Sequence, residues 1–79
     1  MDYRECRVQL QRQERSVGDE VTRWLDFDSP QVDVLLLGLL SAGIQRTGGS
    51  MERLGEYSLT VLDLRGRRIR TFAAGAVEK

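Results

Sequence analysis

The sequence predicts a single small α+β domain in which two antiparallel β-hairpins pack on one apolar helix, in the order ββαββ. Three observations predict it: polar and apolar residues alternate near both ends, a leucine-rich run lies between them, and turn-forming residues separate the segments. A chain of 79 residues suits one domain with a thin core. We place this domain over residues 1–79, with residues 74–79 as a frayed tail.

The first segment, residues 4–12, alternates as a half-buried strand does. Its expected buried face carries Cys6, Val8 and Leu10. Cys6 is the only cysteine in the chain, so no intrachain disulfide can form. A lone thiol in a strand pattern indicates a small core residue rather than a reactive group.

The second strand is expected over residues 21–27, after a polar turn at residues 13–19 in which Gly18 takes a positive φ. Trp24 falls out of phase with the apolar residues of this strand. Two interpretations remain open for it. The ring either covers the edge of the core or stands exposed as a binding residue of the type enriched at interfaces.

The central segment begins with Asp28, Ser29 and Pro30, which are typical of a helix start. We expect the helix to run from Pro30 to Ala42 or Gln45. Short apolar runs are also found as buried strands, and that alternative stays open. The Ser-Pro start and the leucines favour a helix.

The apolar stripe of this helix spans about 200°, wider than the stripe with which a surface helix faces its core. Its expected inner face carries Val32, Leu35, Leu36, Leu39 and Gly43. One small sheet cannot bury the rest, so we predict a homodimer. The predicted self-association surface consists of Val34, Leu37, Gly38, Leu40, Ser41 and Ile44.

The second hairpin follows a polar, glycine-rich loop at residues 45–52. Residues 57–61 alternate as a third strand, and residues 63–66 have the Asp and Gly positions of a type I turn. The last strand is expected over residues 67–73. This tight hairpin is the clearest local pattern in the chain.

The residue types argue against an enzyme or a metal site. The chain has no histidine, and its twelve basic and twelve acidic residues balance, which gives no overall field toward nucleic acid or membrane. Asp26, Asp28 and Asp33 lack the spacing of a calcium loop. The glycines match neither a P-loop nor a dinucleotide fingerprint. We therefore expect no catalytic residue, no metal and no cofactor.

A basic cluster near the C-terminus supports a second function class. Strand alternation would place Arg68, Arg70 and Phe72 on one face, which could follow a phosphate backbone and stack on a base. A solvated sheet face is the alternative explanation. The candidate contacts for a partner or a nucleic acid are Trp24, Arg65, Arg67, Arg68, Arg70 and Phe72.

The expected location is the cytoplasm. Residues 1–5 have no apolar signal segment, and the run at residues 32–44 is shorter than the roughly 20 residues needed to span a bilayer. The lone thiol suits a reducing compartment. These features predict no membrane partner.

The spacing of aromatic, basic and turn residues resembles small proteins of actinobacteria and their phages. The residues that match are Tyr3, Arg4, Val8, Leu10, Arg12, Trp24, residues 26–30, Tyr57, Leu59, Val61, Asp63, Gly66 and Arg67. The resemblance includes no catalytic motif. For a phage-encoded protein, it implies an accessory role on a host protein in the host cytoplasm. The leucine-rich helix departs from the usual charged one.

The functional prediction is a small non-enzymatic interaction module that self-associates through its helix and binds another protein. A nucleic-acid-binding accessory protein that uses the Arg-rich hairpin is the alternative. A structural subunit of a larger complex, whose helix meets a different chain, is the third hypothesis.

Overall fold

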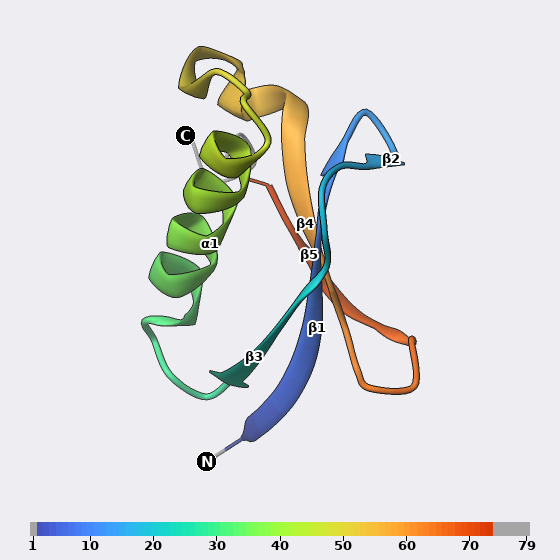
Figure 1. Cartoon of the computed structure of the whole chain (residues 1–79). Coiled ribbons are helices and arrows are strands. Elements are labelled where there is room, and N and C mark those ends of the chain that lie inside the picture. Colours follow the sequence, from blue (N-terminus) through green and yellow to red (C-terminus); the bar gives the residue numbers. More distant parts are fainter. Residues whose placement is uncertain (1, 74–79) are drawn as a thin grey trace.

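The computed structural model describes residues 2–73, so the predicted frayed tail at residues 74–79 lies outside the described residues. The architecture is α+β, as predicted, with an antiparallel sheet covered on one face by a helix (Figure 1). The elements in chain order are β1 (Tyr3–Arg12), β2 (Arg15–Ser16), β3 (Val21–Asp26), α1 (Val32–Arg46), the 3-10 helix η1 (Met51–Glu56), β4 (Tyr57–Leu62) and β5 (Arg68–Phe72).

Strand β1 is the centre of the sheet and joins the two predicted hairpins. One of its edges pairs with β3 and, further along, with the short β2; its other edge pairs with β4, and β5 lies outside β4. Val8 lies opposite both Val21 of β3 and Val61 of β4. The chain therefore forms one antiparallel sheet rather than two separate hairpins.

The first hairpin turns earlier than the sequence predicts. Gln13 and Glu14 occupy a two-residue turn with φ of 52° and 72°. Such turns need a positive φ at both positions and usually contain Asn or Gly, so a Gln-Glu pair does not predict one. Arg15 and Ser16 return to pair with β1. The positive φ of Gly18, 71°, is confirmed.

Helix α1 begins two residues later than predicted. The hydroxyl of Ser29 accepts a hydrogen bond from the amide of Gln31 (3.1 Å), and the carboxylate of Asp26 accepts one from the amide of Asp28 (3.0 Å). These short polar side chains stabilise a turn in front of the helix. Gln31 is the N-cap and makes no side-chain cap hydrogen bond.

The C-terminal end of α1 extends to Arg46, one residue beyond the predicted limit. Gly48 has a φ of 80°, and the amide of Gly49 donates to the carbonyl of Ile44 (2.9 Å). Glycine is favoured where a helix ends with left-handed backbone. The loop predicted over residues 45–52 is shorter in the structure, because residues 45 and 46 belong to α1 and the 3-10 helix η1 begins at Met51.

The core lies between α1 and the face of the sheet that carries Cys6. Its residues are Cys6, Val8, Leu10, Leu25, Val32, Leu36, Leu40, Ile44, Tyr57, Leu59, Val61 and Phe72. The predicted buried face of β1 is confirmed. A Cβ on Gly43 would lie 3.3 Å from the side chain of Leu10, so this glycine permits the close approach of α1 to β1.

The face of α1 that packs on the sheet differs from the predicted inner face by a rotation about the helix axis. Leu40 and Ile44 are 0% exposed, so their assignment to the self-association surface is wrong. Leu35, placed on the inner face, is exposed. Val32, Leu36, Leu40 and Ile44 form a ridge at i+4 spacing, and this ridge packs on the sheet.

The second hairpin confirms the predicted turn. The amide of Gly66 donates to the carbonyl of Asp63 (3.0 Å), and the Asp63 carboxylate accepts from the amides of Arg65 and Arg67, both at 2.9 Å. Gly66 has a φ of 89°. The turn residues therefore work as the sequence indicates.

A bulge in β5 breaks the predicted alternation. Val61 pairs with Arg70 whereas Leu62 pairs with Arg68, which leaves Ile69 without an opposite residue. Arg70 thus shares the helix-covered face with Val61, and Arg68 lies on the other face. The prediction that both arginines share one face is wrong.

Candidate interaction surface

An apolar stripe runs along the outer side of α1, opposite the core. It consists of Val34, Leu37, Gly38 and Ser41, four of the six predicted self-association residues, at the spacing i, i+3, i+4 and i+7. Val34 is 67% exposed, Leu37 is 41% exposed, Gly38 is exposed and Ser41 is half-buried. We call these four residues the outer stripe.

The outer stripe can pack closely against another helix. It has no charged side chain, and a Cβ built on Gly38 meets nothing within 4 Å. Small residues let two helix backbones approach each other, while the neighbouring Val34 and Leu37 supply apolar area. The outer stripe is therefore an uncharged helix surface with a glycine at its centre.

A second apolar surface lies where β1 and β3 meet the first turn of α1. The rings of Tyr3 and Trp24 stack with centroids 5.4 Å apart, and Trp24 is 54% exposed. This exposure shows that the ring stands on the surface; that it binds a partner stays a prediction. The stacking of Tyr3 on Trp24 was not predicted, because strand register cannot be read from a single strand.

The Tyr3–Trp24 pair borders a shallow hollow of about 340 Å³. The other residues around it are Asp26, Ser29, Gln31, Val32, Val34 and Leu35. Leu35 reaches this hollow because the helix is rotated from its predicted orientation. We call this feature the aromatic hollow.

Acidic side chains gather beside the aromatic hollow. Asp26 lines it, and one oxygen of its carboxylate accepts from the amides of Asp2 (3.3 Å) and Asp28 (3.0 Å). Arg4 pairs with Asp2 at 2.7 Å and lies over the ring of Phe27. The backbones of Asp2 and Asp28 thus meet the Asp26 carboxylate at this end of the molecule, and Arg4 pairs with Asp2.

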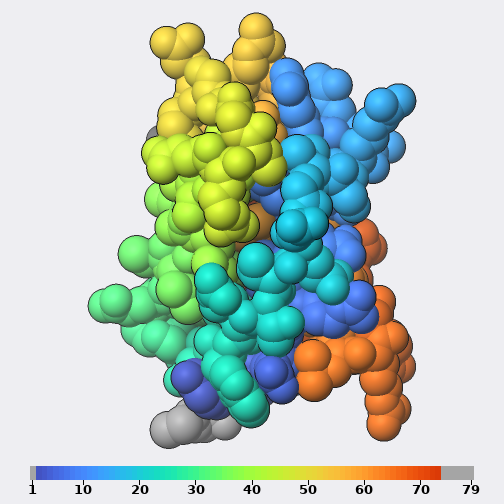
Figure 2. Space-filling model, viewed as in Figure 1, coloured from blue at the N-terminus to red at the C-terminus, as the bar shows by residue number. Residues whose placement is uncertain are grey.

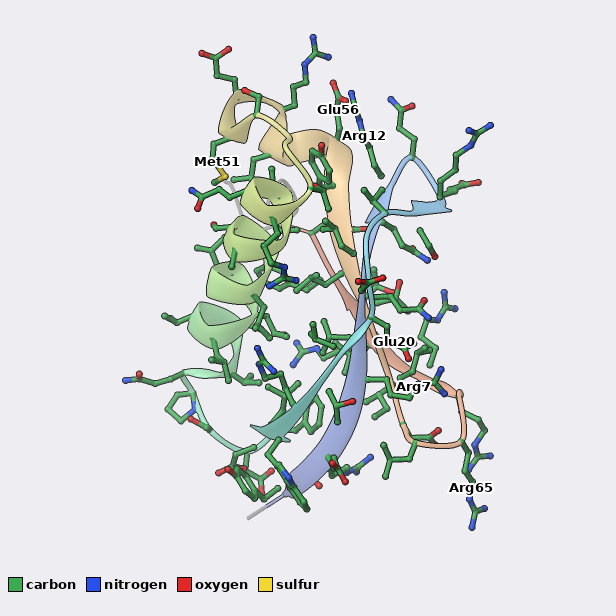
Figure 3. The ribbon with its side chains drawn as sticks, in the orientation of Figure 1. Arg7, Arg12, Glu20, Met51, Glu56 and Arg65 are labelled. Atoms are coloured by element: carbon green, nitrogen blue, oxygen red, sulfur yellow. The ribbon has the colours of Figure 1, made fainter. Side chains whose placement is uncertain are left out.

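The predicted basic patch is divided by the fold. Arg70 pairs with Asp33 of α1 (3.4 Å), and Phe72 is buried in the core, so its prediction as an exposed contact is wrong. Arg65, Arg67 and Arg68 remain exposed on the second hairpin, where Arg65 points away from the sheet (Figure 3). Arg67 lies 3.7 Å from Asp63.

Two ion-pair groups stabilise the surface away from these sites. Glu56 accepts hydrogen bonds from Arg12 (2.8 and 3.0 Å), which lowers the pKa of its carboxyl (Figure 3). Arg7 and Gln9 both donate hydrogen bonds to the carboxylate of Glu20, which lowers its pKa. In both pairs the shift follows from hydrogen bonds between the carboxylate and a partly exposed arginine.

Further tests of chemistry concern the thiol and metal binding. Burial raises the pKa of the Cys6 thiol, which keeps it protonated. Within residues 2–73, no three side chains of metal-ligating type come together as a site. The same residues include no helix that is both long enough and apolar enough to cross a membrane.

Comparison of the chain with protein-family models, with curated protein sequences and with solved structures gave no match. The outer stripe and the aromatic hollow therefore have to be interpreted from their own geometry.

Proposed function

We propose that the chain is a small non-enzymatic interaction module that self-associates through the outer stripe of α1 and binds another protein. The observation that supports it most is the continuity of the stripe. Val34, Leu37, Gly38 and Ser41 follow one line along the helix and expose apolar surface with no charge in it. A two-fold axis on this line would place each residue against the same surface of a second copy.

The expected strength of this contact is modest. Full burial of a valine or leucine side chain contributes about 1.5 to 3 kcal/mol, and Val34 and Leu37 are already partly covered. Four such side chains across a two-fold axis give about 3 to 6 kcal/mol, which is of the order of the cost of association. Close packing at Gly38 would add to this sum. We therefore expect a dimer that dissociates on dilution.

The test compares two leucine substitutions in sedimentation velocity over a dilution series. Leu37→Glu introduces a charge into the outer stripe and should leave a monomer at every concentration. Leu64→Glu is the matched control, since Leu64 is 56% exposed in the loop between β4 and β5, which Figure 1 shows on the other side of the view from α1. Equal behaviour of wild type, Leu37→Glu and Leu64→Glu would refute self-association through α1.

Nucleic-acid binding is a second candidate because three guanidinium groups remain exposed on one hairpin. Arg65, Arg67 and Arg68 could contact phosphates, although the aromatic residue of the original pattern, Phe72, is unavailable for stacking. Binding of single-stranded DNA that weakens steeply with salt, and that Arg65→Ala and Arg68→Ala abolish, would support this function. Salt-independent or absent binding would exclude it.

A further inference from the structure

We propose that the two α1 helices of the self-associated protein run antiparallel and cross at Gly38, so that the C-terminal half of α1 from a second copy covers the aromatic hollow. The inference rests on the self-association proposed above, and it adds the orientation of the two helices, their register and the occupant of the hollow. That occupant is residues 41–46 of the second copy.

The exposed side of α1 differs in side-chain size between its two halves. Val34, Leu35 and Leu37 are exposed in the N-terminal half, whereas the small residues Ser41 and Ala42 follow in the C-terminal half. An antiparallel pair packs the larger side chains of each helix on the small residues of the other. A parallel pair would set large against large and small against small, which leaves gaps. Because close packing needs large and small side chains to interdigitate, side-chain size favours the antiparallel pair.

Gly38 sets the register of this pair. It is exposed near the middle of α1, and a Cβ at this position would meet no neighbouring element within 4 Å. Figure 1 shows that no other element of the described chain lies over this side of the helix. Two helix backbones approach most closely where a Cβ is missing. A two-fold axis at Gly38 sets residues equally far before and after it opposite each other, so Val34 faces Ala42 and Gln31 faces Gln45 of the second copy.

This register brings the C-terminal half of the second helix to the aromatic hollow. The hollow lies at the N-terminal end of α1, where Gln31, Val34 and Leu35 line it together with Trp24 of β3. Figure 2 shows β3 and α1 next to each other on one side of the molecule. At about 100° per residue, Ala42 lies on the same side of α1 as Leu35. A two-fold axis between antiparallel helices keeps the β3 sides of both copies together, so each hollow receives the other copy's Ala42.

The charges at the two ends of α1 favour the same orientation. Asp33 lies in the first turn and Arg46 in the last turn. Arg46 forms no ion pair with any other residue in the range 2–73, whereas Asp33 stays 59% exposed beside Arg70. An antiparallel pair brings Arg46 to the acidic end of the second helix and opposes the two helix dipoles. Exposed charges contribute little to affinity, so they select the orientation while the apolar contact supplies the strength.

The hollow enlarges a contact that the outer stripe alone leaves small. A specific interface buries about 1,200 to 2,000 Å² of total surface, and the outer stripe consists of four residues, one of them a glycine. Tyr3, Trp24 and Leu35 are 57%, 54% and 46% exposed. Tryptophan and tyrosine are among the residues that contribute most to binding at interfaces. Their burial in both copies brings the contact closer to the area that a stable dimer needs.

Engineered disulfides test the orientation and the register together. Gln31→Cys and Gln45→Cys are made as single variants, and Cys6 does not interfere because it is buried. An oxidised equimolar mixture should form the disulfide between positions 31 and 45, identified by mass spectrometry of the peptides, and each variant alone should stay reduced. Leu64→Cys, on the second hairpin, is the control for random collision and should form no disulfide with either variant.

The possible outcomes distinguish this arrangement from self-association itself. Disulfides that join 31 to 31 and 45 to 45 would show a parallel pair and overturn the inference while leaving the proposed dimer intact. Absence of any disulfide in a protein that light scattering shows to be a dimer would also overturn it. A monomer at every concentration would overturn both this arrangement and the proposed self-association.

The fluorescence of Trp24 tests the cover over the hollow, since it is the only tryptophan of the chain. Quenching by acrylamide should decrease as the concentration rises through the range in which the mass doubles. In Leu37→Glu, which stays monomeric, quenching should not depend on concentration. Equal quenching of wild-type monomer and dimer would show that the hollow remains open and would overturn its assignment to a second copy.

Charge reversal tests the contact of Arg46. Arg46→Glu should raise the dissociation constant of the dimer by about tenfold, since two symmetric contacts change at once. Arg65→Glu is the matched control on the second hairpin and should leave the dissociation constant unchanged. Sedimentation velocity measures both variants, and an equal effect of the two substitutions would contradict the antiparallel register.

Discussion

The inner and outer sides of α1 contain the same kinds of residue and have opposite environments. Leu36 and Leu40 are fully buried against the sheet, whereas Leu37, between them in sequence, is 41% exposed. The helix therefore has more apolar surface than its own sheet covers. Residue type is the same on both sides, so the orientation of the helix on the sheet decides which leucines are buried. Strand β3 repeats this contrast with one paired and one open edge.

The largest expected effect is a difference in stability between variants on the inner side and variants on the outer side of α1. Leu40→Ala should lower the free energy of unfolding by about 2 to 5 kcal/mol, because it leaves a cavity between the helix and the sheet. Leu37→Ala should cost less than about 1 kcal/mol when measured at concentrations that keep the protein monomeric. Urea denaturation of both variants checks the difference, and equal losses would contradict the orientation of α1.

A substitution at Gly38 should have two smaller and opposite effects, one on the stability of the monomer and one on self-association. The Gly38→Ala substitution should stabilise the monomer by about 0.5 to 1 kcal/mol, since alanine favours a helix and its Cβ meets no other atom within the chain. The same methyl group should weaken self-association, because it stands where two helix backbones would approach. Thermal denaturation at low concentration measures the first change and sedimentation the second. Ser41→Ala is the control for a small change elsewhere on the outer stripe. Tighter association of Gly38→Ala would place the contact away from Gly38.

The smallest effect concerns acid stability, away from both sides of α1. Hydrogen bonds from Arg12 hold the pKa of Glu56 below its unfolded value, which is about 4.3. A lowered folded-state pKa stabilises the protein above the unfolded pKa, and this contribution is lost as pH falls through the folded pKa. Glu56→Gln should therefore lower the melting temperature slightly at neutral pH and match the wild type at acid pH, where the Glu56 carboxyl is protonated. An unchanged melting temperature at neutral pH would show that the Glu56–Arg12 pair does not contribute.

Local patterns were sufficient to predict the order of the four longer strands and the helix, and the second hairpin, but not β2 or η1. Alternation identified β1 and β4, and the Asp and Gly residues of the 63–66 turn specify their own backbone geometry. Which face of α1 packs on the sheet could not be predicted, because a leucine-rich run has several equally apolar faces. That ambiguity put Leu40 and Ile44 on the wrong side.

Tertiary pairing determined the features that local patterns missed. The bulge at Ile69 places Arg68 and Arg70 on opposite faces of the sheet, and no residue type in β5 predicts this bulge. The stacking of Tyr3 on Trp24 depends on the register between β1 and β3. Candidate contact residues on strands were therefore less predictable than the outer stripe, whose spacing follows from the helix alone.

The molar mass of the wild-type protein in solution tests the central claim most directly. Light scattering over a dilution series should show a value near twice the 9.0 kDa of the chain at high concentration, falling toward the monomer on dilution. A constant mass of one chain at every concentration would contradict self-association through α1.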